Sequence, residues 1–205
     1  MDFKKQISGI ESAYPSGSKG ALVPEQLDEG EVDFLVFGLN PAEARDDKEA
    51  DYTDKFYFIH PSKMKTKGQA RWTNKLKSLF PDGNVLFQAE LIYWTSRDRS
   101  DLESKIGKLK KGNIYFDASL EINCEILKKY NSAIPVFLGL GHEDVAVEMF
   151  GASETEVVLE GSKGVLLKRG IFGERVFYIA RHPSSVGITN KDKEEIKEYF
   201  TNLRR

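Results

Sequence analysis

The chain has 205 residues, a formal net charge of −2 at pH 7 and a pI near 6.0, so it lacks the global basic field of many nucleic-acid-binding proteins. No apolar run approaches the ~20 residues of a membrane span, and no signal-peptide pattern follows the N-terminus. One cysteine, Cys124, and three histidines exclude an internal disulfide and a four-thiolate metal site. We therefore expect a soluble, cytoplasmic, monomeric protein with no metal or cofactor, built as a single domain over residues 1–205.

Continuous apolar runs predict the strands, since strands buried on both faces of a parallel sheet have this pattern. The runs cover residues 33–38, 85–94, 134–140 and 176–180. Apolar residues at helical spacing lie between or after them: Trp72-Leu76-Leu79-Phe80, Leu120-Cys124-Leu127-Tyr130 and Ile196-Tyr199-Phe200-Leu203. This alternation predicts a three-layer α/β/α fold with a central, mainly parallel four-stranded sheet. Two apolar runs flanking Phe172-Gly173-Glu174 predict an added C-terminal antiparallel hairpin.

The loops at the carboxyl ends of parallel strands are where such sheets bind ligands. Here these loops begin at Gly38, Trp94, Gly139 and Arg181. Candidate functional residues are therefore sought in these four places. His142, at the start of a helix in the third loop, is expected to cap the helix or to pack.

Gly38-Leu39-Asn40-Pro41 follows the first strand and His182-Pro183-Ser184-Ser185-Val186 follows the last. Together they resemble the two signature motifs of the uracil-DNA glycosylase superfamily, and the first is most similar to the G-I-N-P-G motif of its mismatch-specific branch. Segments 56–61, 71–72 and 136–142 also look like ordered landmarks of that branch. The resemblance covers about residues 33–190 and implies a uracil-DNA glycosylase-like fold with DNA as the partner.

The resemblance implies a monofunctional DNA glycosylase, which flips a non-standard pyrimidine out of the helix and hydrolyses its N-glycosidic bond. Cleavage leaves an oxocarbenium-like sugar and an anionic base, so it needs a donor at the base and a water on the other face of the sugar. His182 is expected to donate to the pyrimidine 2-oxygen, and Asn40 to hold the water. Because an amide cannot take the water's proton, we expect slow catalysis. No lysine nucleophile is implied, so the product is an abasic site.

The implied base-binding residues are Gly38, Leu39, Ala42, Phe58, Gln88 and Glu90. Phe58 matches the aromatic on which the flipped base stacks. Ala42 stands where uracil-specific relatives have a tyrosine that blocks the pyrimidine 5-position, so it leaves that position open. Glu90, or Gln88 on the same strand face, replaces a base-reading asparagine, and a carboxylate accepts from an exocyclic amine. These departures favour a 5-modified cytosine, as for superfamily members thought to act on phage DNA.

The implied DNA contacts are Arg181, Ser184 and Ser185 at phosphates and Val186 as a wedge in the base stack. Basic residues in an insertion relative to the family add a local positive patch: Lys63, Lys65, Lys67 and Arg71. Such a charge run is also typical of a solvated face.

Structural roles are alternatives for the other candidates too. His182 is consistent with a structural residue at a strand end, and Glu90 with a buried residue in an ion pair. Phe58 is consistent with a core residue, and Asn40 with a turn residue. Uracil or thymine mismatch repair, a silent nucleic-acid-binding protein and a nucleotide-processing enzyme remain alternatives.

Overall fold

The computed structural model describes residues 3, 7, 9, 10, 14, 27, 30–40 and 67–203, without the side chains of 67–71. Within this part the strands are β1 (Phe34–Gly38), β2 (Leu86–Glu90), β3 (Ile134–Leu138), β4 (Glu156–Gly161), β5 (Gly164–Phe172) and β6 (Arg175–Ala180). They form one mixed sheet in the order β2-β1-β3-β6-β5-β4. The first four strands in this order are parallel, and β5 and β4 continue the sheet antiparallel.

This topology confirms an α/β fold with a mostly parallel central sheet, and it corrects the expected strand number. The predicted hairpin exists, with Phe172 opposite Arg175, but it belongs to the central sheet because β6 pairs with β3 on its other side. The sheet described here therefore has six strands, not four. The strand that was not predicted, β4, is a largely exposed edge strand, so it lacks the continuous apolar run that marked the others.

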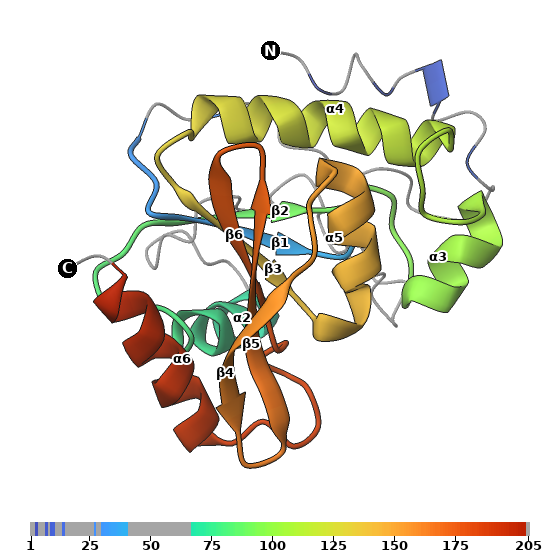
Figure 1. Cartoon of the computed structure of the whole chain (residues 1–205). Coiled ribbons are helices and arrows are strands. Elements are labelled where there is room, and N and C mark those ends of the chain that lie inside the picture. The colour runs from blue at the N-terminus through green and yellow to red at the C-terminus, as the bar shows by residue number, and fades with distance from the viewer. Residues whose placement is uncertain are drawn as a thin grey trace.

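Helices cover both faces of the sheet (Figure 1). They are α2 (Lys67–Lys77), α3 (Arg99–Ile106), α4 (Ile114–Lys129), the short 3-10 helix η3 (Leu140–His142), α5 (Glu143–Phe150) and α6 (Asn190–Asn202). One buried cluster joins α3, α4 and α5 to one face of the sheet, where Phe37 of β1 packs. The second joins α2 and α6 to the other face, where Phe34 lies against Phe80 and Phe200. The two faces alternate along each strand, as the two-residue period requires.

The predicted apolar face of α4 is confirmed at Leu127 and Tyr130, which are buried, but is wrong at Cys124. Cys124, expected on that face, is exposed, whereas Asn123 is fully buried. The Asn123 side chain donates to the backbone oxygens of Glu90 and Leu91, both at 3.1 Å, and accepts from the hydroxyl of Tyr93 at 2.8 Å. A polar residue with these partners belongs in the core, so a pattern built on apolar residues alone missed Asn123 and wrongly included Cys124. Its bonds fix the backbone at the end of β2.

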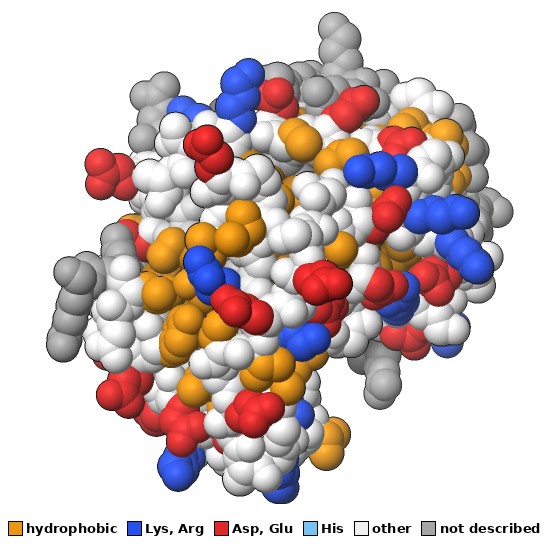
Figure 2. Space-filling model, in the orientation of Figure 1, with side chains coloured by type: hydrophobic (Ala, Val, Ile, Leu, Met, Phe, Trp, Pro, Cys, Tyr) orange, Lys and Arg blue, Asp and Glu red, His pale blue; other side chains and the backbone are white. Residues whose placement is uncertain are grey.

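Charges of both signs are interspersed over the described part of the face in Figure 2, in agreement with the small net charge. No helix in the described residues is long and apolar enough to cross a membrane. Any binding of an anionic polymer would thus depend on local groups of cations and not on a uniform field.

Replacing Asn123 by leucine should lower the free energy of unfolding by at least ~2 kcal/mol, because each buried polar group left without a partner costs about 1–3 kcal/mol. Urea unfolding followed by circular dichroism measures the change. Asn202→Ala, at an exposed position in the last turn of α6, is the matched control and should stay within ~0.5 kcal/mol of the wild type. Equal stability of Asn123→Leu and the control would contradict the anchoring role of Asn123.

Candidate functional site

The four parallel strands end side by side and in register. Gly38 at the end of β1 pairs with Glu90 at the end of β2, and Leu138 of β3 pairs with Ala180 of β6. Since β3 lies between β1 and β6, the loops that carry Asn40 and His182 begin about 10 Å apart, given the usual spacing of strands. The two predicted catalytic residues therefore lie on the same edge of the sheet.

The amide of Asn40 has a fixed orientation. Its Nδ2 donates to Ser96 Oγ at 2.8 Å, and the backbone oxygens of Trp94 and Ser96 lie at 3.4 Å from the same nitrogen. Ser96 is almost fully buried, and its hydroxyl donates to the Asp98 carbonyl at 2.7 Å. The hydroxyl proton is thus engaged, so Ser96 Oγ receives the amide as an acceptor. Oδ1 of Asn40 is therefore the atom that can accept a hydrogen bond from a water.

His182 is held as a neutral imidazole with a defined tautomer. The backbone N–H of Ser184 donates to its Nδ1 at 3.2 Å, which leaves the ring proton on Nε2. Burial lowers the pKa of His182 below the ordinary value of 6.5, and the nearby His142 and Lys75 lower the pKa further. A neutral ring with Nε2–H is a hydrogen-bond donor that carries no net charge near pH 7.

Gln88 and Glu90 lie on the same face of β2, as predicted. Gln88 Nε2 lies 3.4 Å from Glu90 Oε1, and Gln88 Oε1 accepts from Trp72 Nε1 at 2.8 Å. The indole of Trp72 also stacks on the imidazole of His182, with ring centroids 5.3 Å apart and an interplanar angle of 22°. A chain of direct contacts therefore connects β2 to the loop after β6 through a side chain of α2.

The carboxylate of Glu90 is buried against the end of β1. A Cβ added to Gly38 would lie 2.2 Å from Glu90 Oε2, so a larger residue would displace the carboxylate from this position. The Glu90 side chain is 6% exposed. The glycine of the first motif therefore has a local purpose here, which is to admit an acceptor between β1 and β2. Leu39, also predicted at the base, is buried in the core on the opposite face.

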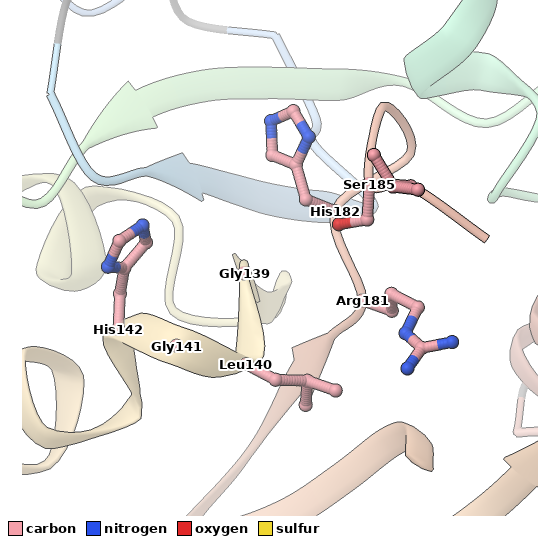
Figure 3. Close-up of a pocket in the computed structure, with 8 residues that line it drawn as sticks. Gly139, Leu140, Gly141, His142, Arg181, His182 and Ser185 are labelled. Carbon is pink, nitrogen blue, oxygen red and sulfur yellow. The ribbon is translucent and has the colours of Figure 1, made fainter. Parts of the chain in front are cut away.

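An open cleft of ≈ 520 Å³ adjoins His182 between the loops after β3 and β6 (Figure 3). It is lined by Gly139, Leu140, Gly141, His142, Arg181, His182, Ser185 and Val186. Of the two roles expected for His142, the structure shows packing: the side chain makes no cap bond and lies over Gly139, where φ is +108° and a Cβ would meet the ring at 2.9 Å. Burial lowers the pKa of His142, and the Arg99 cation lowers it further.

An ion pair ties α3 to the start of α5, and a hydrogen bond ties α3 to the segment after β3. The guanidinium of Arg99 makes two bonds to the Asp144 carboxylate, at 2.7 and 2.6 Å, and a third to the Gly141 carbonyl at 3.3 Å. This contact holds the pKa of Asp144 below its ordinary value of 3.8. A bidentate pair restricts geometry more than a single bond does, so this wall of the cleft is held in place.

The predicted DNA-contacting residues of the last loop lie in different environments. Val186 is fully exposed at the rim of the cleft, with a relative exposure of 103%. The guanidinium of Arg181 donates to the Lys163 carbonyl at 3.0 Å, on the other side of the chain from the His182 ring (Figure 3). The backbone N–H groups of Ser184 and Ser185 are used inside the turn, by His182 Nδ1 and the His182 carbonyl. At Ser184 and Ser185, therefore, the hydroxyl groups and not the backbone N–H groups are suited to contact a phosphate.

Several predicted residues cannot be placed in this site. Ala42, Phe58, Lys63 and Lys65 lie outside the described residues. Lys67 and Arg71 lie in α2, but their side chains are not described. Among the described residues, no group of three or more His, Cys, Asp or Glu side chains could hold a metal ion.

The site also contains residues that were not assigned to it from the sequence. Trp72 was expected on a helix face and in the 71–72 landmark of the resemblance but was given no role in the site, and Ser96 and Lys75 were not assigned a role individually. Lys75 Nζ donates to Ser184 Oγ at 3.2 Å, which brings a cation of α2 to the loop after β6. The one available signal was the position of Ser96 in a loop after a predicted strand.

No family model and no curated protein sequence matches this chain. The site is therefore characterised by its own geometry: an oriented amide, a neutral imidazole and a buried carboxylate on one edge of a mostly parallel sheet.

The His182 imidazole should titrate with a midpoint below 6.5 in an NMR pH titration, with the resonance assigned by its loss in His182→Gln. Lys75→Met should move the midpoint upward, because it removes a neighbouring cation. The lowered pKa means that the unfolded chain binds more protons near pH 6, so this histidine's contribution to stability is lost as pH falls through the folded-state pKa. A midpoint at or above 6.5 in the wild type would contradict the neutral assignment.

Proposed function

We propose that the protein is a monofunctional DNA glycosylase that removes a non-standard pyrimidine, with a 5-modified cytosine as the preferred base. The observation that carries this proposal is the pairing of an oriented amide, Asn40, with a neutral imidazole, His182, on the same edge of the sheet. These are the residues of the two motifs that resemble the uracil-DNA glycosylase superfamily.

In the proposed reaction the two groups act on different parts of the nucleotide. His182 Nε2–H donates to the pyrimidine 2-oxygen as negative charge develops on the leaving base. A donor in a partly desolvated site stabilises such charge more than it would in water. Asn40 Oδ1 orients a water toward the sugar carbon. The amide takes no proton, so the bond to the base breaks largely before the water attacks the oxocarbenium-like sugar. The proton that the water then loses passes to solvent, and the anionic base takes up a proton from solvent to leave as the neutral base.

The preferred base is inferred from Glu90 and its neighbour. The carboxylate offers acceptors only, which suit the exocyclic amine of a cytosine and oppose the carbonyl of uracil or thymine. The resemblance adds Ala42, whose small side chain stands where a tyrosine excludes 5-substituents in uracil-specific relatives. Acceptor and open position together favour an amino pyrimidine with a substituent on carbon 5.

Exposed side chains of the last loop suit contact with a duplex. Val186 is apolar and fully exposed, as a side chain that enters a base step must be. Lys75, bonded to Ser184, supplies a positive charge beside that loop despite the net charge of −2. A phosphate next to the flipped nucleotide would be attracted to this cation.

Asn40→Ala and His182→Ala should each slow base release by about 10²–10³, the usual cost of losing one group that stabilises developing charge. Release is measured by mass spectrometry of free bases and by abasic-site cleavage of duplexes that carry modified cytosine, uracil or a thymine mismatch. Both variants should stay folded at the assay temperature and keep the DNA affinity of the wild type. Asn40→Ala should unfold at a lower temperature than the wild type, because it removes the donor to the buried Ser96 Oγ. Full turnover in both variants would refute the site, and no release from any substrate would indicate a silent nucleic-acid-binding protein.

Glu90→Gln should reduce the preference for modified cytosine over uracil by about 10-fold or more, since one good contact to a base edge discriminates by about 1–3 kcal/mol. Rates are compared on otherwise identical duplexes with a single target base. Glu103→Gln, on the partly exposed face of α3, is the matched control and should leave the ratio unchanged. Faster release of uracil by the wild type, with a ratio insensitive to Glu90→Gln, would favour ordinary repair of uracil.

A further inference from the structure

Trp72 makes two different contacts with residues of the candidate site. Its ring stacks on His182 with a centroid distance of 5.3 Å, and its Nε1–H donates to Gln88 Oε1 at 2.8 Å. The side chain comes from α2, and its two partners come from β2 and from the loop after β6. The indole is therefore placed to influence both the leaving-group donor and the base-reading face.

We infer that Trp72 is a positioning residue with two separable roles, which are to restrain the His182 ring and to set the orientation of the Gln88 amide. This inference rests on the proposed glycosylase function, because the two partners of Trp72 are the proposed donor and the neighbour of the proposed reader. The roles are separable because the stack needs an aromatic ring and the amide orientation needs the indole N–H.

The stack limits how the imidazole can move. Rotation of His182 about its terminal side-chain bond would break the bond from the Ser184 N–H and would also tilt the ring away from the indole. With one edge and one face of the ring engaged, Nε2–H keeps a constant direction. A fixed donor needs no reorganisation when charge develops on the leaving base, and this is the source of its effect on rate.

The hydrogen bond selects one of the two orientations of the Gln88 amide. An indole N–H can only donate, so it requires the amide oxygen on its side and sends the amide nitrogen toward Glu90. This face of β2 then presents the carboxylate acceptors of Glu90 beside the N–H donors of the Gln88 amide. This order matches a base edge in which an exocyclic amine stands next to a ring nitrogen that accepts, as in cytosine. A ring N–H next to a carbonyl, as in uracil, has the opposite order.

Three substitutions separate the two roles. Trp72→Phe keeps a ring for the stack and removes the donor, Trp72→Leu removes both, and Asn74→Leu on an exposed position of the same helix is the matched control. Trp72→Phe should keep the kcat on modified cytosine within about threefold of the wild type. It should lower the ratio of the rates for modified cytosine and uracil by about tenfold. Trp72→Leu should also lower kcat by about tenfold or more at constant KM. Asn74→Leu should match the wild type in all three quantities.

The results that overturn the inference are equally specific. Wild-type kcat and base preference in both Trp72 variants would show that the contacts have no function. Equal losses in Trp72→Phe and Trp72→Leu, without a change in preference, would show that the indole only packs. Unfolding in urea identifies a variant that loses activity through instability, and Trp72→Phe is the variant that keeps most of the packing.

A readout without activity distinguishes this inference from the proposed function. If the wild type releases no base from any duplex, the proposed function fails, but the contacts of Trp72 can still be measured by NMR. Gln88→Leu should shift the indole Nε1–H resonance and speed its exchange with water. Trp72→Leu should expose the His182 ring and raise its pKa toward 6.5, with His142 and Lys75 unchanged as its titratable neighbours. Unchanged resonances in both variants would overturn the inference.

Discussion

The parallel pairing of β2, β1, β3 and β6 is the constraint on which the candidate site depends. It brings the carboxyl ends of four strands to one edge in register, so loops far apart in the sequence begin next to each other. Asn40 follows β1 and His182 follows β6, and each of these strands has a neighbour on both sides. The antiparallel β5 therefore matters for the site, because it makes β6 an interior strand. Side chains that follow interior strands are held in place better than side chains that follow an edge strand, and a preorganised site needs its groups in fixed positions.

Burial gives this edge its electrostatic character. His142 and His182 line one cleft, and burial is the largest cause that lowers the pKa of each ring. The Glu90 carboxylate lies close to the end of β1, in the space that Gly38 leaves open. The site thus combines an uncharged donor with a buried acceptor. In a partly desolvated setting both groups interact with a polar ligand more strongly than they would in water, and neither has to shed a full hydration shell first.

Local signals explain what could be predicted. Continuous apolar runs identified the four parallel strands, and the loops after two of them identified Asn40 and His182. The two-residue period put Gln88 and Glu90 on the same face. On α4 the buried Asn123 was missed because it is polar, whereas Cys124 was wrongly expected in the core. The strand β4 was missed because an exposed edge strand has no apolar run. The stack of Trp72 on His182 joins residues 110 positions apart, and no spacing rule reports such a tertiary contact.

The surroundings of Asn40 bear on why an amide, and not a carboxylate, occupies that position. Its nitrogen faces three oxygens: the Ser96 hydroxyl and the backbone carbonyls of Trp94 and Ser96. The hydroxyl proton of Ser96 is directed at the Asp98 carbonyl, so all three act as acceptors toward residue 40. A carboxylate at position 40 would place an oxygen against these three acceptor oxygens, with no hydrogen atom to bond them. Burial would strengthen the repulsion between the oxygens. An aspartate, which could take a proton from water, would need a different loop after β2. The limited catalytic power expected from Asn40 is thus coupled to the loop that orients it, and the two would have to change together.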